Sequence, residues 1–350
     1  MRRLVREAIE QGAVGLSSGL DYIPSRYADT EELIALCEEI APFGGVYVTH
    51  MRRYDPEGVL GSLDEVFTIG GRAGCAVHVS HFNSRADLVL PPFDAAARRG
   101  LDATYDLYCY LAGSSILGMV ALPAWAQEGG PEATLARLRD PDMRARLRGD
   151  TGLPRVPREA ARLSFIAAPE YRPFEGQTLA EAARQAGRDV ADFVCDLLVA
   201  SDLAVGCVFP HRGRGEEDVR ALTRHPAMMA GSDGIYAGGR PHPRGCGCFA
   251  RYLGHYVREA KVWSLEQAVQ HLSAHAARRF GLKDRGLLRE GLAADVVVFD
   301  PQTISDQATY DEGQRLAAGV RHVLVNGQCV LREGERTSAL PGRPLRHGRG

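Results

Sequence analysis

Short apolar runs alternate with helical patterns over the first hundred residues, and this alternation constrains the fold more than any other feature. Apolar runs at 45–49, 75–80 and 101–107 are separated by helical patterns at 58–74 and 90–99. Such an alternation is typical of buried strands that are joined by crossover helices and therefore pair in parallel. The sequence predicts an α/β protein built on a parallel sheet.

The alternation breaks after these three runs. Residues 111–204 read as mixed loops and helices, including one amphipathic helix over 179–200. Strand signals return at 204–209 and 227–230, and a further strand is expected at 13–17. We expect about five strands in the parallel sheet, with the segment 111–204 inserted between them.

A different pattern begins after residue 280. Short strands and turns replace the helical patterns, and Asn326-Gly327 between two apolar runs is a strong hairpin signal. We therefore expect two units. The first is a parallel α/β unit over 1–280 that contains the insertion, and the second is a C-terminal β unit over 281–350.

Composition and charge exclude several classes of function. The 42 basic and 44 acidic residues leave a net charge of −2, which is unlike a nucleic-acid-binding protein. No apolar stretch of about 18 residues predicts a membrane span, and the charged start, Met1 to Glu7, does not resemble a secretory signal. Eight scattered cysteines without a CxxC pair indicate reduced thiols. We expect a cytoplasmic protein that binds a small molecule rather than nucleic acid or a membrane.

Polar side chains stand directly after three of the apolar runs. They are His50, His81 and Asp233. In parallel α/β barrels, active sites gather at the carboxyl ends of the strands. Two neutral imidazoles and a carboxylate that converge there would suit a divalent metal and its activated water. The alternative for each residue taken alone is a hydrogen-bonded loop position.

The other histidines of interest are expected to have structural roles. His78 lies three residues before His81, so strand alternation places it on the opposite face, packed against the helical layer. His211 belongs to a loop rich in Gly and Arg, where it could touch a substrate, but a solvated position is favoured. His271 and His275 are four residues apart on a helix, but no Glu completes an HExxH motif, so a helix surface or interface is favoured.

Motifs of a known family occur along the chain in a fixed order: Gly15-Leu16-Ser17-Ser18-Gly19-Leu20, Thr49-His50-Met51-Arg52, Ser80-His81, Gly231-Ser232-Asp233-Gly234 and Arg240-Pro241-His242-Pro243-Arg244. This order resembles the N-acyl-D-amino-acid deacylase (D-aminoacylase) family of the amidohydrolase superfamily over essentially the whole chain. The resemblance implies a metal-dependent (β/α)8 barrel with a small β-sandwich domain, to which the C-terminal segment contributes. It also implies zinc-dependent hydrolysis of the amide bond of N-acyl-D-amino acids to a D-amino acid and a carboxylate.

The resemblance implies roles for single residues as well. His50 and His81 match the family's zinc ligands, and Asp233 matches its catalytic aspartate. The family positions that hold the substrate's α-carboxylate are matched by Tyr108, Ser114 and Arg244. An arginine suits that task because its planar guanidinium binds a carboxylate through two parallel hydrogen bonds.

Position 83 departs from the family. Two residues after the second zinc histidine the family commonly has a lysine that helps to hold the carboxylate, whereas this chain has Asn83. Arg244 is then expected to be the main cation of the substrate site. The neutral Asn83 also leaves a second enzyme class open, a dihydroorotase- or hydantoinase-like amidohydrolase that acts on cyclic amides.

The start of the chain departs from the family too. The family begins with strands of the β domain, an H-x-H pair at the first barrel strand and a Cys ligand soon after, and this sequence has no H-x-H pair at an early strand end. About five strands are expected of a barrel that needs eight. We therefore expect an N-terminally truncated chain, a partial barrel that offers zinc two protein ligands. An inactive fragment is the remaining alternative, and its exposed strand edges would favour association.

Overall fold

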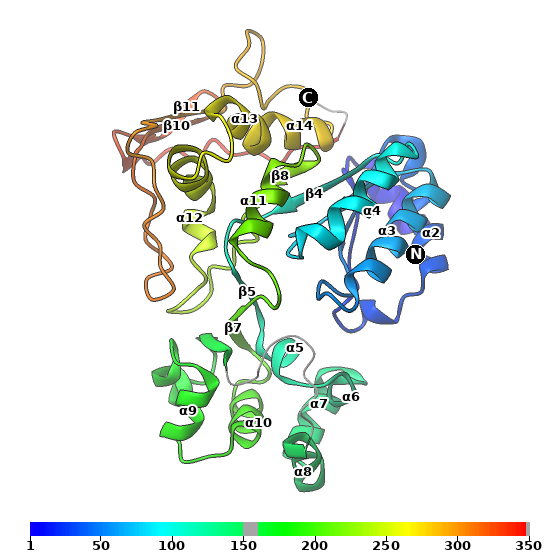
Figure 1. Cartoon of the computed structure of the whole chain (residues 1–350), viewed down its shortest axis with the longest axis vertical. Helices are drawn as coiled ribbons and strands as arrows, with labels where there is room; N and C mark the ends of the chain where they lie inside the picture. Colours follow the sequence, from blue (N-terminus) through cyan, green and yellow to red (C-terminus); the bar gives the residue numbers. More distant parts are fainter. Residues whose placement is uncertain (150–159, 348–350) are drawn as a thin grey trace.

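A computed structural model describes residues 1–149 and 160–347 of the chain. At its centre lies a five-stranded sheet in which every neighbouring pair of strands is parallel (Figure 1). In sheet order the strands are β1 (Gly15–Gly19), β2 (Val46–His50), β3 (Ala76–Val79), β4 (Ala103–Leu107) and β8 (Met228–Ala230). The predicted α/β class and the expectation of about five parallel strands are confirmed.

Helices connect these strands and cover the sheet. They are α1 (Arg2–Glu10), α2 (Thr30–Cys37), α3 (Val59–Ala73), α4 (Ala86–Arg98) and α11 (Glu216–Arg224), with short 3-10 helices η1 (Ser25–Tyr27) and η2 (Ala41–Phe43). Local sequence sets the helix ends: Asp29 caps α2 by accepting the backbone N–H of Glu32 at 2.8 Å, and Gly74 ends α3 with a left-handed φ of 70°. Leu63 of α3 and Val77 of β3 are buried where helix and sheet meet.

The segment between β4 and α11 folds into a layer of its own, drawn at the bottom of Figure 1. Its strands form an antiparallel sheet in the order β5 (Ala112–Ile116), β7 (Val205–Pro210) and β6 (Arg162–Ile166). Its helices are α5 (Leu117–Ala121), α6 (Ala124–Gln127), α7 (Gly130–Arg139), α8 (Pro141–Gly149), η4 (Pro169–Phe174), α9 (Leu179–Gln185) and α10 (Val190–Ala200). The prediction of loops and helices alone over 111–204 is therefore wrong, because it omits β5 and β6.

The single helix predicted over 179–200 is two helices. Gly187 follows α9 with a left-handed φ of 64°, which interrupts the helical path. Asp189 then starts α10 by accepting the backbone N–H of Ala191 at 2.8 Å. The apolar periodicity continues across this break, so periodicity alone did not reveal it.

The chain after β8 returns to the sheet and ends in strands. α12 (Arg244–Arg251) runs into the π-helix η5 (Tyr252–Glu259), and α13 (Leu265–Val269), η6 (Gln270–Ala274) and α14 (His275–Arg279) follow. The last strands form an antiparallel sheet in the order β12 (Glu335–Arg336), β11 (Gln328–Arg332), β10 (Val320–Val325) and β9 (Val296–Phe299). Asn326 and Gly327 join β10 to β11 with positive φ angles of 48° and 78°, so the predicted hairpin is confirmed.

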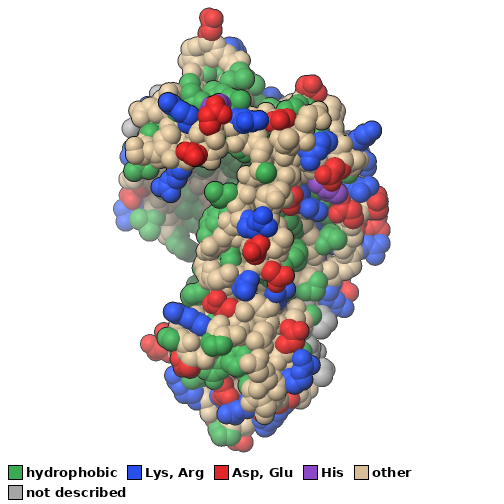
Figure 2. All heavy atoms as spheres, turned by 90° about the vertical axis from the view of Figure 1, so that its left-hand side faces the viewer, with side chains coloured by type: hydrophobic (Ala, Val, Ile, Leu, Met, Phe, Trp, Pro, Cys, Tyr) green, Lys and Arg blue, Asp and Glu red, His purple; other side chains and the backbone are tan. Residues whose placement is uncertain are grey.

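Two hydrophobic clusters underlie this arrangement, one between the parallel sheet and its helices and one inside the inserted layer. On the surface, acidic and basic side chains are interspersed over the face seen in Figure 2, as the near balance of 42 basic and 44 acidic residues predicts. Among the described residues, no helix combines the length and the apolar character needed to cross a bilayer.

Candidate active site

Two histidines at neighbouring strand ends face each other. His50 is the last residue of β2, and His81 lies just beyond the end of β3. His50 Nδ1 and His81 Nε2 are 2.9 Å apart. His81 has a φ of 36°, in the left-handed region that residues other than glycine rarely adopt. The structure thus brings the two predicted metal ligands together.

A half-buried carboxylate supports this pair, although the sequence pattern did not predict a role for it. Asp106 of β4 accepts the backbone N–H of His81 at 2.8 Å and the Nε2–H of His78 at 2.9 Å. Burial acts to raise the pKa of Asp106, but the hydrogen bond from His78 and the nearby imidazoles hold that pKa below its usual value. Gly231 is needed beside it, since a Cβ there would lie 2.7 Å from Asp106 Oδ1. A charged residue inside an apolar strand was the signal that could have pointed to Asp106.

His78 is buried and contacts the helical layer, with its ring centroid 5.7 Å from that of Phe280 at the end of α14. Packing is not its only contact, however. Its Nδ1 lies 2.8 Å from the Thr104 hydroxyl, and its Nε2 bonds to Asp106. The expectation of a packing residue is therefore incomplete, because the hydrogen bonds of His78 also join β3 to β4 and reach Asp106, the residue that accepts the backbone N–H of His81.

The electrostatics around His81 favour a neutral imidazole. Burial, followed by the neighbouring His50, lowers the pKa of His81 to about 3. His81 is then uncharged at neutral pH, which is the protonation state that a metal ligand requires.

The predicted aspartate and arginine form an ion pair in this structure. Asp233 follows β8 with a left-handed φ of 47°, and its Oδ2 lies 2.8 Å from Nη2 of Arg244 at the start of α12. Burial raises the pKa of Asp233, while the guanidinium of Arg244 opposes that rise. The pair therefore combines a carboxylate of raised pKa, still partly open to solvent, with a buried guanidinium.

Arg244 is almost fully buried and contacts both of the other predicted carboxylate-binding residues. Its guanidinium carbon lies 4.4 Å from the centroid of the Tyr108 ring, and its Nη2 donates to the backbone oxygen of Ser114 at 3.4 Å. Its Nε and Nη1 have no hydrogen-bond partner among the described residues. These buried N–H groups are donors that an anionic ligand can satisfy.

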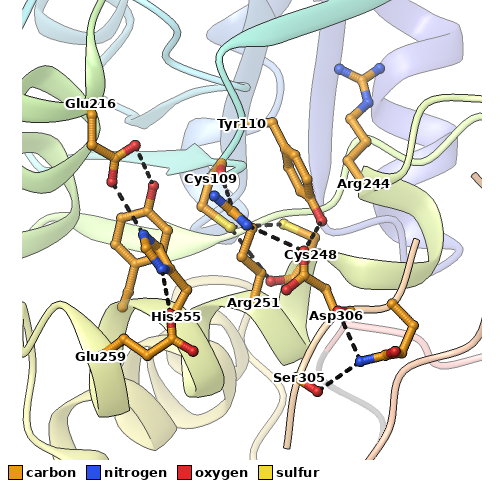
Figure 3. Close-up of polar contacts among 12 residues, drawn as sticks. Cys109, Tyr110, Glu216, Arg244, Cys248, Arg251, His255, Glu259, Ser305 and Asp306 are labelled. Atoms are coloured by element: carbon orange, nitrogen blue, oxygen red, sulfur yellow. Dashed lines mark hydrogen bonds and ion pairs between the residues drawn. The ribbon is translucent and has the colours of Figure 1, made fainter. Parts of the chain in front are cut away.

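The rest of α12 is held from the opposite side (Figure 3). Arg251 Nε donates to the backbone oxygen of Cys109 at 3.1 Å, and its Nη1 lies 3.3 Å from Asp306. Cys248 packs against Cys109 with their sulfurs 4.0 Å apart. Figure 3 shows the Arg244 side chain pointing away from this cluster, which holds the helix in place.

A cavity of about 220 Å³ joins these elements. Its lining is Tyr22, His50, Tyr54, Asp55, His81, Asn83, Tyr108, Gly113, Ser114, Ser115, Ile116, Val120, Phe209, Pro210, His211, Arg212, Asp233 and Ile235. Six of the seven site residues predicted from the sequence line it, and the seventh, Arg244, contacts three of those six. The inserted layer contributes to its wall through β5 and β7.

The expectation that His211 is solvated is wrong. His211 lines the cavity, its Nε2 lies 3.0 Å from the Tyr108 hydroxyl, and burial lowers its pKa well below the usual value. His271 and His275 both bond through Nδ1 to the backbone oxygen of Met228, at 2.6 and 2.9 Å, and so hold their helical segment against β8.

The two imidazoles fit part of a zinc site. Two nitrogens that bind one tetrahedral zinc at about 2.1 Å lie about 3.4 Å apart, about 0.5 Å more than the 2.9 Å between His50 Nδ1 and His81 Nε2. Asp21 lies 3.6 Å from His50 Nε2, on the side where a carboxylate commonly orients a ligating imidazole. Within residues 1–149 and 160–347, however, no group of three or more His, Cys, Asp or Glu side chains could hold a metal ion. These residues therefore supply part of a donor set.

Comparisons with known proteins agree with this fold. The family model described as "Amidohydrolase family" matches residues 1–331. Two enzymes of Alcaligenes xylosoxydans xylosoxydans, an N-acyl-D-glutamate deacylase and a D-aminoacylase, are each 34% identical over 99% of this chain, which spans 63% and 64% of their lengths. The crystal structure of N-acyl-D-glutamate deacylase from Bordetella bronchiseptica, complexed with zinc and a phosphonate mimic of the tetrahedral intermediate, aligns with a TM-score of 0.76 and 34% identity, covering 94% of this chain and 62% of that one.

The match over most of the chain shows that this protein belongs to the amidohydrolase family. The chain spans just under two thirds of the length of the curated deacylases it matches.

Proposed function

We propose that this protein catalyses the zinc-dependent hydrolysis of the amide bond of N-acyl-D-amino acids, releasing a D-amino acid and a carboxylate. The observation that carries the proposal is one cavity lined by two facing imidazoles and Asp233, with Arg244 held against Tyr108 and Ser114 at its edge. The 34% identity to N-acyl-D-glutamate deacylase supports the substrate class. Free thiols at all eight cysteines support a cytoplasmic location.

In this proposal, His50 and His81 each offer one neutral imidazole to zinc. Bound zinc would polarise the scissile carbonyl and lower the pKa of a coordinated water. Asp233 takes a proton from the attacking water and later gives it to the leaving amine nitrogen. Its raised pKa suits both transfers, because a carboxylate that is too acidic holds protons poorly.

Arg244 and Tyr108 hold the substrate's α-carboxylate, which lies on the amine side of the scissile amide bond. Arg244 is already fixed by its ring contact and by α12, so little side-chain entropy is lost when the anion binds. A fixed carboxylate orients the chiral carbon, and this makes hydrolysis selective for one enantiomer.

Zinc content and hydrolysis measured together test the proposal. The 350-residue chain is loaded with zinc, its metal is counted by mass spectrometry, and amine release is followed for N-acetyl-D-methionine, N-acetyl-D-glutamate and N-acetyl-D-aspartate. The L-enantiomers serve as matched controls. Bound zinc with D-selective hydrolysis supports the proposal, and the absence of both contradicts it.

Asp233→Asn gives the corresponding mutational prediction. The variant keeps the size of the side chain but cannot accept the water proton, so turnover should fall by at least about 100-fold, as expected for loss of a general base. Zinc content should stay nearly unchanged. Loss of zinc from the variant would contradict a proton-transfer role and assign Asp233 to metal binding instead.

A second candidate function rests on the neutral side chain of Asn83, which leaves room for a cyclic amide without a carboxylate. Hydantoins and dihydropyrimidines are therefore added to the same substrate panel. Hydrolysis of these rings in preference to the N-acyl-D-amino acids would favour the second candidate.

A further inference from the structure

Asn83 does not stand alone in the cavity wall. Its side-chain oxygen lies 2.6 Å from Nη1 of Arg214, which comes from the loop between β7 and α11. A guanidinium can only donate hydrogen bonds, so the amide oxygen of Asn83 must be the atom that faces Arg214. The amide nitrogen, which can only donate, is left for other partners. The Asn83 side chain can therefore offer the cavity a hydrogen-bond donor, its amide nitrogen.

Arg214 is a buried cation without a counter-ion. Only 7% of the residue is exposed, and among the described residues it forms no ion pair. Nη1 also donates to the backbone oxygen of Tyr110 at 3.1 Å, whereas Nε and Nη2 are buried without a hydrogen-bond partner. A buried charge of this kind is costly unless an opposite charge approaches it.

Asp218, four residues further along the chain, does not form an ion pair with Arg214. Asp218 uses one carboxylate oxygen to accept the backbone N–H of Ala86 and the other to accept that of Gly215, both at 2.8 Å. It is therefore committed to capping α11 and to joining α11 to α4. The charge of Asp218 acts on Arg214 only from a distance, so an anion in direct contact with the guanidinium must come from elsewhere.

An anionic ligand bound in the cavity could supply this negative charge. Asn83, Tyr108 and His211 all line it. The charge of Arg214 acts on two of these groups, since it contributes to lowering the pKa of His211 and opposes the rise in the pKa of Tyr108. Arg244 acts on Tyr108 in the same direction. Both guanidinium charges therefore favour the ionised form of Tyr108.

We propose that Arg214 is a specificity-determining residue that acts through Asn83 to make this part of the cavity a receptor for a carboxylate. The amide nitrogen of Asn83 donates to the carboxylate, and Arg214 behind it supplies the positive charge. This inference rests on the proposed function and deepens it, because it selects N-acyl amino acids with a free carboxylate over neutral or cyclic amides. The charge that a lysine at position 83 would carry is supplied here by Arg214.

Binding to a charged and a neutral ligand tests the inference without turnover. The metal-free chain is titrated calorimetrically with N-acetyl-D-methionine and with its carboxamide, which differs only in lacking the negative charge. The carboxylate should bind at least tenfold more tightly. Arg214→Met should remove most of this preference and leave the affinity for the carboxamide within about twofold.

Two further variants separate charge from structure. In Asn83→Lys/Arg214→Met the cation is moved to position 83, and the preference for the carboxylate should return. Arg224→Met removes an exposed arginine at the end of α11, outside the cavity lining, and should change the preference less than threefold. Ligand-free Arg214→Met should melt at the same temperature as the wild type or higher, because it loses an uncompensated buried charge.

If Arg214→Met lowers the affinity for the carboxylate and for the carboxamide by the same factor, the inference is overturned, because such a result would indicate a structural role. Unchanged affinities of Arg214→Met for both ligands would overturn it as well. If Arg214→Met does not fold, Asn83→Ala decides by the same pair of ligands, since it removes the proposed donor. Failure of hydrolysis with an intact preference for the carboxylate would count against the proposed function and leave this inference standing.

Discussion

His242 connects the carboxylate site to the inserted layer. Its Nε2 donates to the backbone oxygen of Ala112 at 2.9 Å, and its Nδ1 accepts the backbone N–H of Arg244 at 3.0 Å. The rings of Tyr110 and Tyr310 pack against it, each with centroids 5.2 Å away. Burial, followed by the charge of Arg244, lowers the pKa of His242 to about 3. The folded protein therefore holds this histidine neutral.

A pH dependence follows from that shift. The unfolded chain has an ordinary histidine pKa of about 6.5, so the contribution of His242 is complete above that pH and is lost as the pH falls toward 3. By pH 5 the loss should be about 2 kcal/mol. The free energies of unfolding of wild type and His242→Gln, measured in urea, should differ by about 2 kcal/mol less at pH 5 than at pH 7. A difference that is equal at both values would show that His242 is not held neutral.

At the scale of single elements, α12 depends on contacts that lie far away in the sequence. Arg251 joins it to Cys109 after β4 and to Asp306 in the segment between β9 and β10. Tyr110 lies close to the same carboxylate, with its hydroxyl 3.4 Å from Asp306. The orientation of Arg244 at the first turn of α12 therefore depends on this cluster at its last turn.

Arg251→Met should separate the helix from this cluster. It removes the donor to the Cys109 carbonyl and the cation beside Asp306, which among the described residues keeps only the Tyr110 hydroxyl, so we expect the free energy of unfolding to fall by about 1 to 3 kcal/mol. The affinity for N-acetyl-D-methionine, measured by the same calorimetric titration, should fall as well. Arg289→Met, at an exposed position, serves as the control and should change stability by less than about 0.5 kcal/mol. An unchanged stability in Arg251→Met would refute the anchoring role.

At the scale of the whole molecule, the two hydrophobic clusters have different members and different neighbours. Leu197 of α10 belongs to the cluster of the inserted layer, and Leu63 of α3 belongs to the cluster under the parallel sheet. Both side chains are almost completely buried. Since each layer buries its own apolar surface, damage to one core should remain largely within that layer.

Leu197→Ala and Leu63→Ala test this separation as a matched pair. Each should lower stability by about 2 to 5 kcal/mol, through lost burial and the cavity left behind. In hydrogen exchange, Leu197→Ala should speed exchange in α10 and β6 while β2 and β3 keep their protection, and Leu63→Ala should do the reverse. Equal acceleration throughout the chain in either variant would show a single cooperative unit.

Local pattern in the sequence was sufficient for much of the fold and site. Apolar runs marked the parallel strands, and the polar residue after a run marked its carboxyl end, so the pattern alone placed His50, His81 and Asp233 at one edge of the sheet. Pattern was insufficient in the inserted layer, where β5 is the Gly- and Ser-rich segment Ala112–Ile116. A segment of this composition has weak strand propensity and is held in place by pairing with β7.

The sequence by itself therefore determined the α/β class, the strand ends and the residue types that meet there, because these depend on periodicity over a few neighbouring positions. Only the tertiary structure decided which distant residues meet. Arg214 and Asn83 are 131 positions apart, and Arg251 and Cys109 are 142 apart. No local preference encodes such pairs. They depend on the order of the strands in the sheet and on how the inserted layer folds back over it, and so does the positive charge that Arg214 places beside Asn83.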